Sequence, residues 1–142
     1  MRSASWIGKE SGSSVIEPAY LLDSNICIFI LADARGAPAR AVQQQDVGRV
    51  VTSSVAYAEV MRGVPIGEYE AFALARRLFE RIEPLPFDRD AADAYVRLPF
   101  RRARFDRLIA AHALSRGLVL VTNNPRDFAD IAGLKVENWC LS

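Results

Sequence analysis

Short apolar runs recur along the chain and are separated by longer segments with helical periodicity. The clearest runs are "AYLLD" at 19–23, "GRVVTSS" at 48–54 and "LVLVT" at 118–122, with weaker extended pieces at 83–87 and 134–139. Apolar runs of this length, bounded by turn residues, predict buried strands. The stretch "LVLV" is apolar throughout, which is typical of a strand covered on both faces of a sheet.

The segments between these runs predict helices at 24–35, 55–63, 68–83, 88–98 and 106–117, and a short one within 123–131. Ser53 or Ser54 is placed to cap the second of them, while Gly63 and Gly117 end the second and the fifth. The helix at 68–83 shows the clearest periodicity. Its predicted inward face consists of Phe72, Ala75, Leu78, Phe79 and Ile82, and its outward face carries Arg76, Arg77 and Glu80.

Strands that alternate with helices predict an α/β fold, in which right-handed crossovers build a parallel sheet covered by helices on both sides. The length of 142 residues fits a single domain. Residues 1–18 are rich in Ser and Gly and lack periodicity, so we expect a disordered extension there and a folded domain over 19–142.

Composition narrows the class of protein. The formal net charge is +1, so no global positive field predicts nucleic-acid binding, and any such role depends on local patches. Cys27 and Cys140 lie far apart without a CxxC motif, which favours packed thiols in a reducing compartment. No apolar run reaches the roughly 18 residues of a membrane span. We therefore expect a cytoplasmic protein.

Acidic and amide side chains follow the predicted strands. Asp23 comes directly after the first strand, Glu59 lies in the helix after the second, and Asp106 opens the helix before "LVLVT". Asn124 and Asp127 follow that last strand. Ligands of parallel α/β sheets bind beyond the carboxyl ends of the strands. The sequence therefore predicts that these residues gather at one edge of the sheet.

Such a cluster of carboxylates needs a counter-charge, because two of them about 4 Å apart repel by roughly 4 kcal/mol at an effective dielectric of 20. The cluster either retains a proton or binds a cation. Oxygen ligands without neighbouring His or Cys suit Mg²⁺ or Mn²⁺. Such an ion supports the attack of water on a phosphodiester.

Each of these residues also has a purely structural interpretation. Asp23 and Asp106 are placed to cap helices, Glu59 to lie solvated on a helix, and Asp127 to be a loop or capping residue. The single histidine, His112, lies within the apolar stretch "AAHAL" and is more typical of a packed residue than of a catalytic base. The joint placement of the acids is what favours a site.

Four segments together resemble the PIN-domain family, specifically VapC-type ribonuclease toxins of type II toxin–antitoxin systems. They are "LLDSNICI", "SSVAYAEVMRGV", "FDRLIAAHALSRGLVLVTNNPRDF" and "GLKVENW", and they span nearly the whole chain after the leader. The resemblance implies a PIN-like fold with a parallel sheet of about four to five strands between helices. It also implies a Mg²⁺- or Mn²⁺-dependent endoribonuclease, neutralised by a VapB-like antitoxin and assembled as a homodimer.

Residue by residue, the resemblance makes Asp23 and Asp106 the main metal ligands and Glu59 the third acid. Asn124 stands close to a position where many members carry Asp, and Asp127 follows three residues later, so the fourth acidic position stays open between them. Asn25 and Thr122 are expected to hold the carboxylates in place through hydrogen bonds.

A basic linker precedes Asp106 and is short by the standard of the family. Its arginines, together with one in the following helix, are candidates for contacts with RNA phosphates or with an acidic antitoxin segment. A solvated charge run is the alternative. These residues are Arg101, Arg102, Arg104 and Arg107.

Two other functions are compatible with parts of the pattern. An aspartate-based phosphatase or phosphoacceptor would use Asp23 as its nucleophile, but such phosphatases carry a second Asp two residues later, where Asn25 stands. A catalytically degenerate PIN-like binding protein would retain the fold without the chemistry. The sequence does not specify which RNA is cut.

Overall fold

The computed structural model describes residues 16–99 and 104–141. Within these ranges the strands are β1 (Tyr20–Leu22), β2 (Val50–Ser53), β3 (Pro84–Leu85), β4 (Val119–Val121) and β5 (Val136–Glu137). They form one five-stranded parallel sheet in the order β3-β2-β1-β4-β5. The predicted parallel sheet is confirmed, and so is each predicted strand.

The helices in the described ranges are α1 (Ser24–Ala32), α2 (Ala37–Gln43), α3 (Ser54–Arg62), α4 (Tyr69–Arg81), α5 (Arg89–Val96) and α6 (Phe105–Arg116). A 3-10 turn, η1 (Pro125–Phe128), follows β4. The sequence pattern missed α2, which starts after Gly36 and has proline in its first turn. The predicted extension at 1–18 falls largely outside the described residues, so that boundary stays a prediction.

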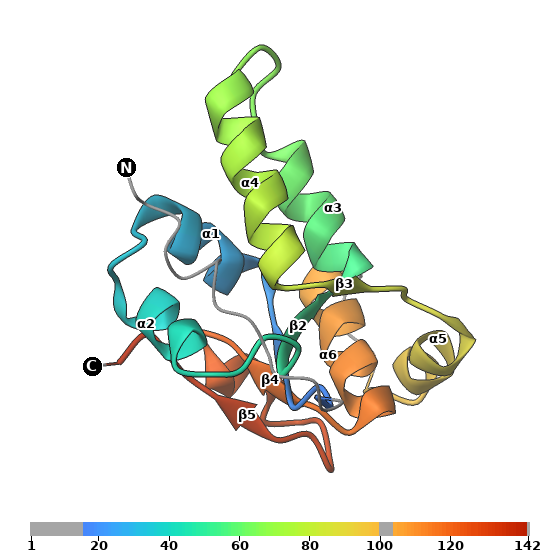
Figure 1. The fold of residues 1–142 in the computed structure, drawn as a ribbon. Helices are drawn as coiled ribbons and strands as arrows, with labels where there is room; N and C mark the ends of the chain where they lie inside the picture. Colours follow the sequence, from blue (N-terminus) through green and yellow to red (C-terminus); the bar gives the residue numbers. More distant parts are fainter. Residues whose placement is uncertain (1–15, 100–103, 142) are drawn as a thin grey trace.

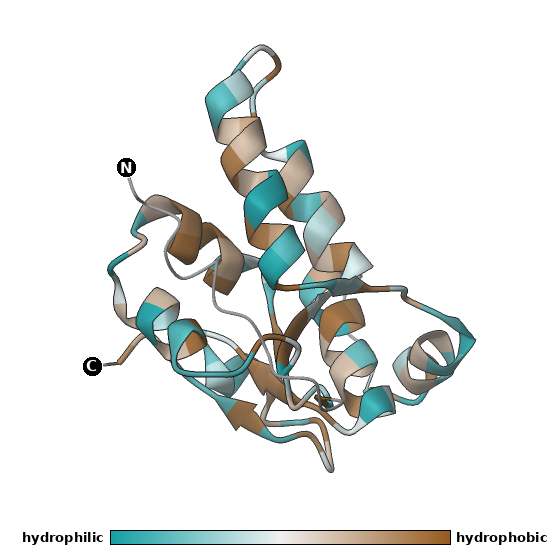
Figure 2. Cartoon of the chain, viewed as in Figure 1, coloured by the Kyte–Doolittle hydropathy of each residue, from teal (hydrophilic) through white to brown (hydrophobic). Residues whose placement is uncertain are grey.

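Successive side chains of each strand point to opposite faces of the sheet, and helices lie on both faces (Figure 1). The buried side chains therefore form two cores, one on each face. Leu22, Val50 and Val121 belong to the core under α1, α2 and α4. Leu21, Val51 and Leu120 belong to the core under α6 and η1. Figure 2 shows the matching concentration of hydrophobic residues in the sheet. Cys27 packs in the first core, and burial raises the pKa of its thiol to about 12.

Helices α3 and α4 form a hairpin that projects beyond the sheet (Figure 1). Ala75, Leu78 and Phe79 of α4 are buried as predicted, but Phe72 is 45% exposed, and its assignment to the inward face is wrong. It lies in the half of α4 nearer the hairpin tip, where no sheet lies beneath the helix. Ile66 and Tyr69 at the tip are also exposed. Clustered exposed apolar side chains of this kind are typical of contact surfaces.

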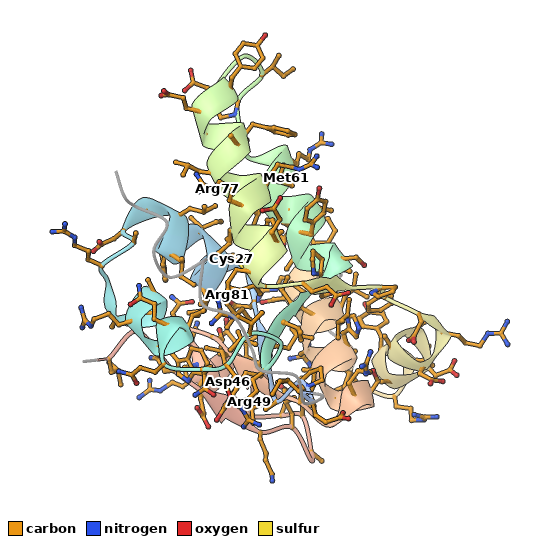
Figure 3. The ribbon with its side chains drawn as sticks, viewed as in Figure 1. Cys27, Asp46, Arg49, Met61, Arg77 and Arg81 are labelled. Carbon is orange, nitrogen blue, oxygen red and sulfur yellow. The ribbon has the colours of Figure 1, made fainter. Side chains whose placement is uncertain are left out.

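Arg81 is the last residue of α4 and connects this helix to the neighbouring α2. It is 2% exposed and donates hydrogen bonds to the carbonyl oxygens of Val42 (3.0 Å), in the last turn of α2, and of Gln45 (2.8 Å), just after that helix. Figure 3 shows Arg81 pointing inward from α4, with Asp46 and Arg49 on the segment that leads to β2. These bonds tie α4 to the end of α2 and help to fix the hairpin relative to the sheet.

Candidate active site

The carboxyl ends of three adjacent strands supply the centre of the site. β1 pairs in register with both β2 and β4, so that Leu22 lies opposite Thr52 and Val121. The next residues along β1 and β4 are therefore neighbours: Asp23 donates its backbone N–H to the carbonyl of Val121 (3.0 Å). The hydroxyl of Thr52 donates to the carbonyl of Leu22 (2.7 Å), which fixes the backbone just before Asp23.

Asp23 is 5% exposed, and its Oδ1 accepts a hydrogen bond from the backbone N–H of Ile26 (3.0 Å). This bond makes Asp23 the N-cap of α1. Burial raises the pKa of Asp23, and the nearby charges of Asp106 and Glu59 raise it further, against hydrogen bonds from Thr122 and Ile26 that lower it. Asp23 thus caps a helix and also lies within the electrostatic reach of two other acids.

Glu59 and Asp106 reach the site from packed helices, α3 and α6. Both side chains are half-buried. Among residues 16–99 and 104–141, no hydrogen-bond partner contacts two buried atoms, Glu59 Oε1 and Asp106 Oδ1. The Nε of Arg104 lies 4.0 Å from Asp106 Oδ1, which is beyond hydrogen-bond range. Buried carboxylate oxygens without partners are costly unless something positive comes to them.

The donor set fits a hard divalent cation in chemistry and charge. It consists of carboxylate oxygens, two of them unpartnered, beside a third carboxylate whose pKa is raised by burial and like charge. As the side chains stand, no three His, Cys, Asp or Glu residues within 16–99 and 104–141 converge closely enough to hold an ion. A shared ion therefore requires side chains to rotate. The Glu59 side chain has three rotatable torsions, so its carboxylate can move toward the other acids.

The remaining predicted site residues lie around β4. Thr122 is 1% exposed, hydrogen-bonds the Asp23 side chain, and accepts the backbone N–H of Asn124 at Oγ1 (3.2 Å). Asn124 and Asp127 are exposed, and Asn25 is exposed in the first turn of α1. The choice between Asn124 and Asp127 stays open, and the role of Asn25 stays a prediction.

Arg107 does not fit the predicted contact with RNA or an antitoxin, because it is only 4% exposed. Its guanidinium makes a two-point ion pair with Asp130 (2.9 and 3.1 Å) and donates to the carbonyl of Asp127 (3.1 Å). Arg104 is exposed, as a contact residue requires. Arg101 and Arg102 lie outside the described residues.

His112 is a packed residue, as the sequence predicted. It is fully buried, its Nδ1 lies 2.8 Å from Ser53 Oγ, and its ring meets Phe87 edge to face. Ser53 Oγ also accepts the N–H of Val55 and so caps α3. The His112–Ser53 pair therefore joins α6 to the start of the helix that carries Glu59. Sequence reasoning missed this pair because the two residues are 59 positions apart.

The sequence profile of the PIN domain matches residues 20–134. The chain is 34% identical to the tRNA(fMet)-specific endonuclease VapC of Shigella flexneri, over 84% of this chain and 97% of that protein. It is 30% identical to Ribonuclease VapC2 of Haemophilus influenzae, with the same coverage. The fold superimposes on the DNA-bound VapBC crystal structure from Salmonella typhimurium with a TM-score of 0.77, 30% identity, and coverage of 87% of this chain and 99% of that one.

Proposed function

The chain belongs to the PIN-domain family and, within it, to the VapC ribonucleases, and from this premise we propose that it is a metal-dependent endoribonuclease toxin. The observation that carries the proposal is the set of carboxylates at the sheet edge. Buried Glu59 Oε1 and Asp106 Oδ1 have no hydrogen-bond partner within the described part of the chain, and the two acids lie close enough to raise the pKa of Asp23. Their preference for a divalent cation is the chemistry that phosphodiester hydrolysis needs.

Asp23 and Asp106 would hold Mg²⁺ or Mn²⁺, with Glu59 as the third acid. A bound ion of this kind supplies charge neutralisation at the scissile phosphate and lowers the pKa of nearby water. Glu59, together with Asn124 or Asp127, would position the attacking water, and a carboxylate of this set, Glu59 or Asp127, would accept its proton. The hydrogen bonds from Ile26 and Thr122 keep the Asp23 carboxylate in a fixed orientation throughout.

The substrate and the partner follow from the relatives. Because the relatives from Shigella and Salmonella are named as specific for tRNA(fMet), we propose initiator tRNA as the first RNA to test. The structural relatives are VapBC complexes, which supports a VapB-like antitoxin that neutralises this chain. A homodimer and a cytoplasmic location complete the proposal. In the part of the chain that the structure describes, no helix is both long and apolar enough to cross a membrane.

Cleavage of RNA is expected to depend on divalent ions. Purified protein incubated with initiator tRNA should produce discrete fragments in Mg²⁺ or Mn²⁺ and none in EDTA, because without an ion the charge that builds on the scissile phosphate is not neutralised. Fragments are followed on denaturing gels, with total RNA as a second substrate. Equal cleavage with and without EDTA would exclude the metal role. No cleavage of either substrate under any condition would favour the degenerate binding protein.

Divalent ions should also raise the melting temperature. An ion that binds only the folded state stabilises it by about 2.7 kcal/mol at 100 times its dissociation constant. Asp106→Asn should lose most of this shift, because it removes a proposed ligand. Asp93→Asn, which alters an exposed acid on α5, is the matched control and should keep it. A shift of the same size in Asp106→Asn would show that the ion binds elsewhere.

A further inference from the structure

A cavity of about 430 Å³ opens between α3 and α6, directly beside the acidic cluster. One of its lining residues is Glu59, so the cavity and the candidate active site share a wall. The rest of the lining is mostly apolar. The lining includes Val55, Ala58, Glu59 and Arg62 of α3 and Phe105 and Leu108 of α6.

Phe105 is the prominent aromatic residue of this cavity. It is the first residue of α6, directly before Asp106, and it is 57% exposed. An exposed phenyl ring gains little from the protein core, whereas Val55 and Leu108, which line the same cavity, are half-buried. The ring is therefore available to a ligand at the position where the chain supplies a carboxylate to the site.

The charges around the cavity favour a nucleic-acid ligand. Arg62 is exposed, lies at the last turn of α3 and lines the same cavity, so it supplies positive charge on the side away from the sheet. Glu59 belongs to the acidic cluster that we assign to the scissile phosphate. A ligand that spans the cavity therefore meets an apolar surface between a cation and the acidic cluster. A nucleotide, with a flat base and phosphates on either side, has this distribution of properties.

We propose that this cavity, called here the base pocket, receives a nucleobase next to the scissile phosphate, with Phe105 stacked on the base and Arg62 contacting a neighbouring phosphate. The inference rests on the proposed ribonuclease function and names the part of the substrate that the chain holds. Stacking tolerates every base, because every base has a π-face. Phe105 consequently contributes binding and alignment, while the choice of sequence comes from elsewhere.

Fluorescence tests the stacking without requiring catalysis. Short single-stranded RNAs that carry 2-aminopurine at one position each are titrated with protein in EDTA. Wild-type protein should quench the probe at one or two adjacent positions. Phe105→Ala should lose this quenching and weaken binding by about tenfold to a hundredfold, the range for removal of one stacking aromatic. Phe105→Trp should retain both, and so should Tyr69→Ala, a control at an exposed aromatic residue of the hairpin tip.

Cleavage kinetics give the second measurement. Phe105→Ala should lower kcat/KM for the RNA that the wild type cuts by about tenfold or more, mainly through KM, with an unchanged melting temperature. If wild type and Phe105→Ala cleave RNA equally well, the base pocket is overturned, while the proposed ribonuclease function stands. If wild type quenches the probe but cleaves no RNA, the ribonuclease function is overturned, while the pocket still binds a base. If Phe105→Ala instead lowers the molar mass measured by light scattering, the ring belongs to an interface between copies, and the base pocket is overturned.

Discussion

Replacement of Asp23 by Asn is expected to abolish RNA cleavage while leaving the fold intact and, without divalent ions, more stable. Loss of a residue that merely supports a metal ligand typically costs about 10- to 100-fold in metal affinity or activity, and Asp23 is proposed as a ligand itself, so its loss should exceed that range. Asn keeps an oxygen that can accept the N–H of Ile26, so the cap of α1 survives. What disappears is a buried negative charge.

The pH dependence of the melting temperature distinguishes the loss of a buried charge from a general effect of the substitution on the fold. Burial, with Asp106 and Glu59, raises the folded-state pKa of Asp23 above its ordinary value. Ionised Asp23 therefore destabilises wild-type protein above that folded pKa, and wild-type protein recovers this stability as the pH falls through it. The melting temperatures of wild type and Asp23→Asn in EDTA should differ at pH 7 and converge in acid. Equal cleavage by the two proteins in Mg²⁺ would refute the assignment of Asp23.

The parallel sheet and its active edge could be predicted because the determining signals are local. Each strand is a short apolar run in the sequence. The polar residue that ends the run marks the end of the strand, and a helix or helical turn starts close after it. Asp23, Thr122 and Ser53 all follow from this rule, since parallel strands in register bring their ends together. Glu59 and Asp106 act electrostatically on Asp23 because they lie on α3 and α6, which pack against each other.

The features that the sequence did not reveal depend on contacts between distant segments. Arg107 belongs to an arginine-rich stretch, and only the folded position of Asp130 shows that it is a buried structural residue. Phe72 continues the periodicity of α4, but the helix extends past the sheet, so its ring has no core to enter. The base pocket requires Arg62 and Phe105 to meet across two helices that are far apart in the sequence.

The ion pair that removes Arg107 from the predicted contact surface also anchors a segment of the candidate active site. Arg107 directly follows Asp106 in α6, and its guanidinium binds both Asp130 and the carbonyl of Asp127. The segment after β4 is thereby held against the start of α6. Since Asn124 and Asp127 both lie in or beside η1, this contact helps to position the two residues that we propose as alternatives for the fourth site residue.

Asp130→Ala is therefore expected to destabilise the protein by about 3 kcal/mol, because it leaves a buried guanidinium without its carboxylate. We take the low end of the usual range because the Asp130 side chain is 26% exposed. The melting temperature should fall by roughly 10 °C for a protein of this size. Chemical unfolding in urea gives the free energy directly. Asp93→Ala, at an exposed acid of α5, is the control and should change it by about 0.5 kcal/mol at most.

The double variant Arg107→Met with Asp130→Ala separates loss of the pair from loss of the Asp130 side chain. Replacing a buried ion pair by apolar groups of similar size is often neutral, so the double variant should recover most of the stability that Asp130→Ala loses. Its activity should nevertheless stay below wild type, because no cation then holds the carbonyl of Asp127. Two results would contradict this explanation: Asp130→Ala unfolds at the same urea concentration as wild type, or the double variant is less stable than Asp130→Ala. Either would show that Asp130 does not stabilise the protein by neutralising the buried guanidinium of Arg107.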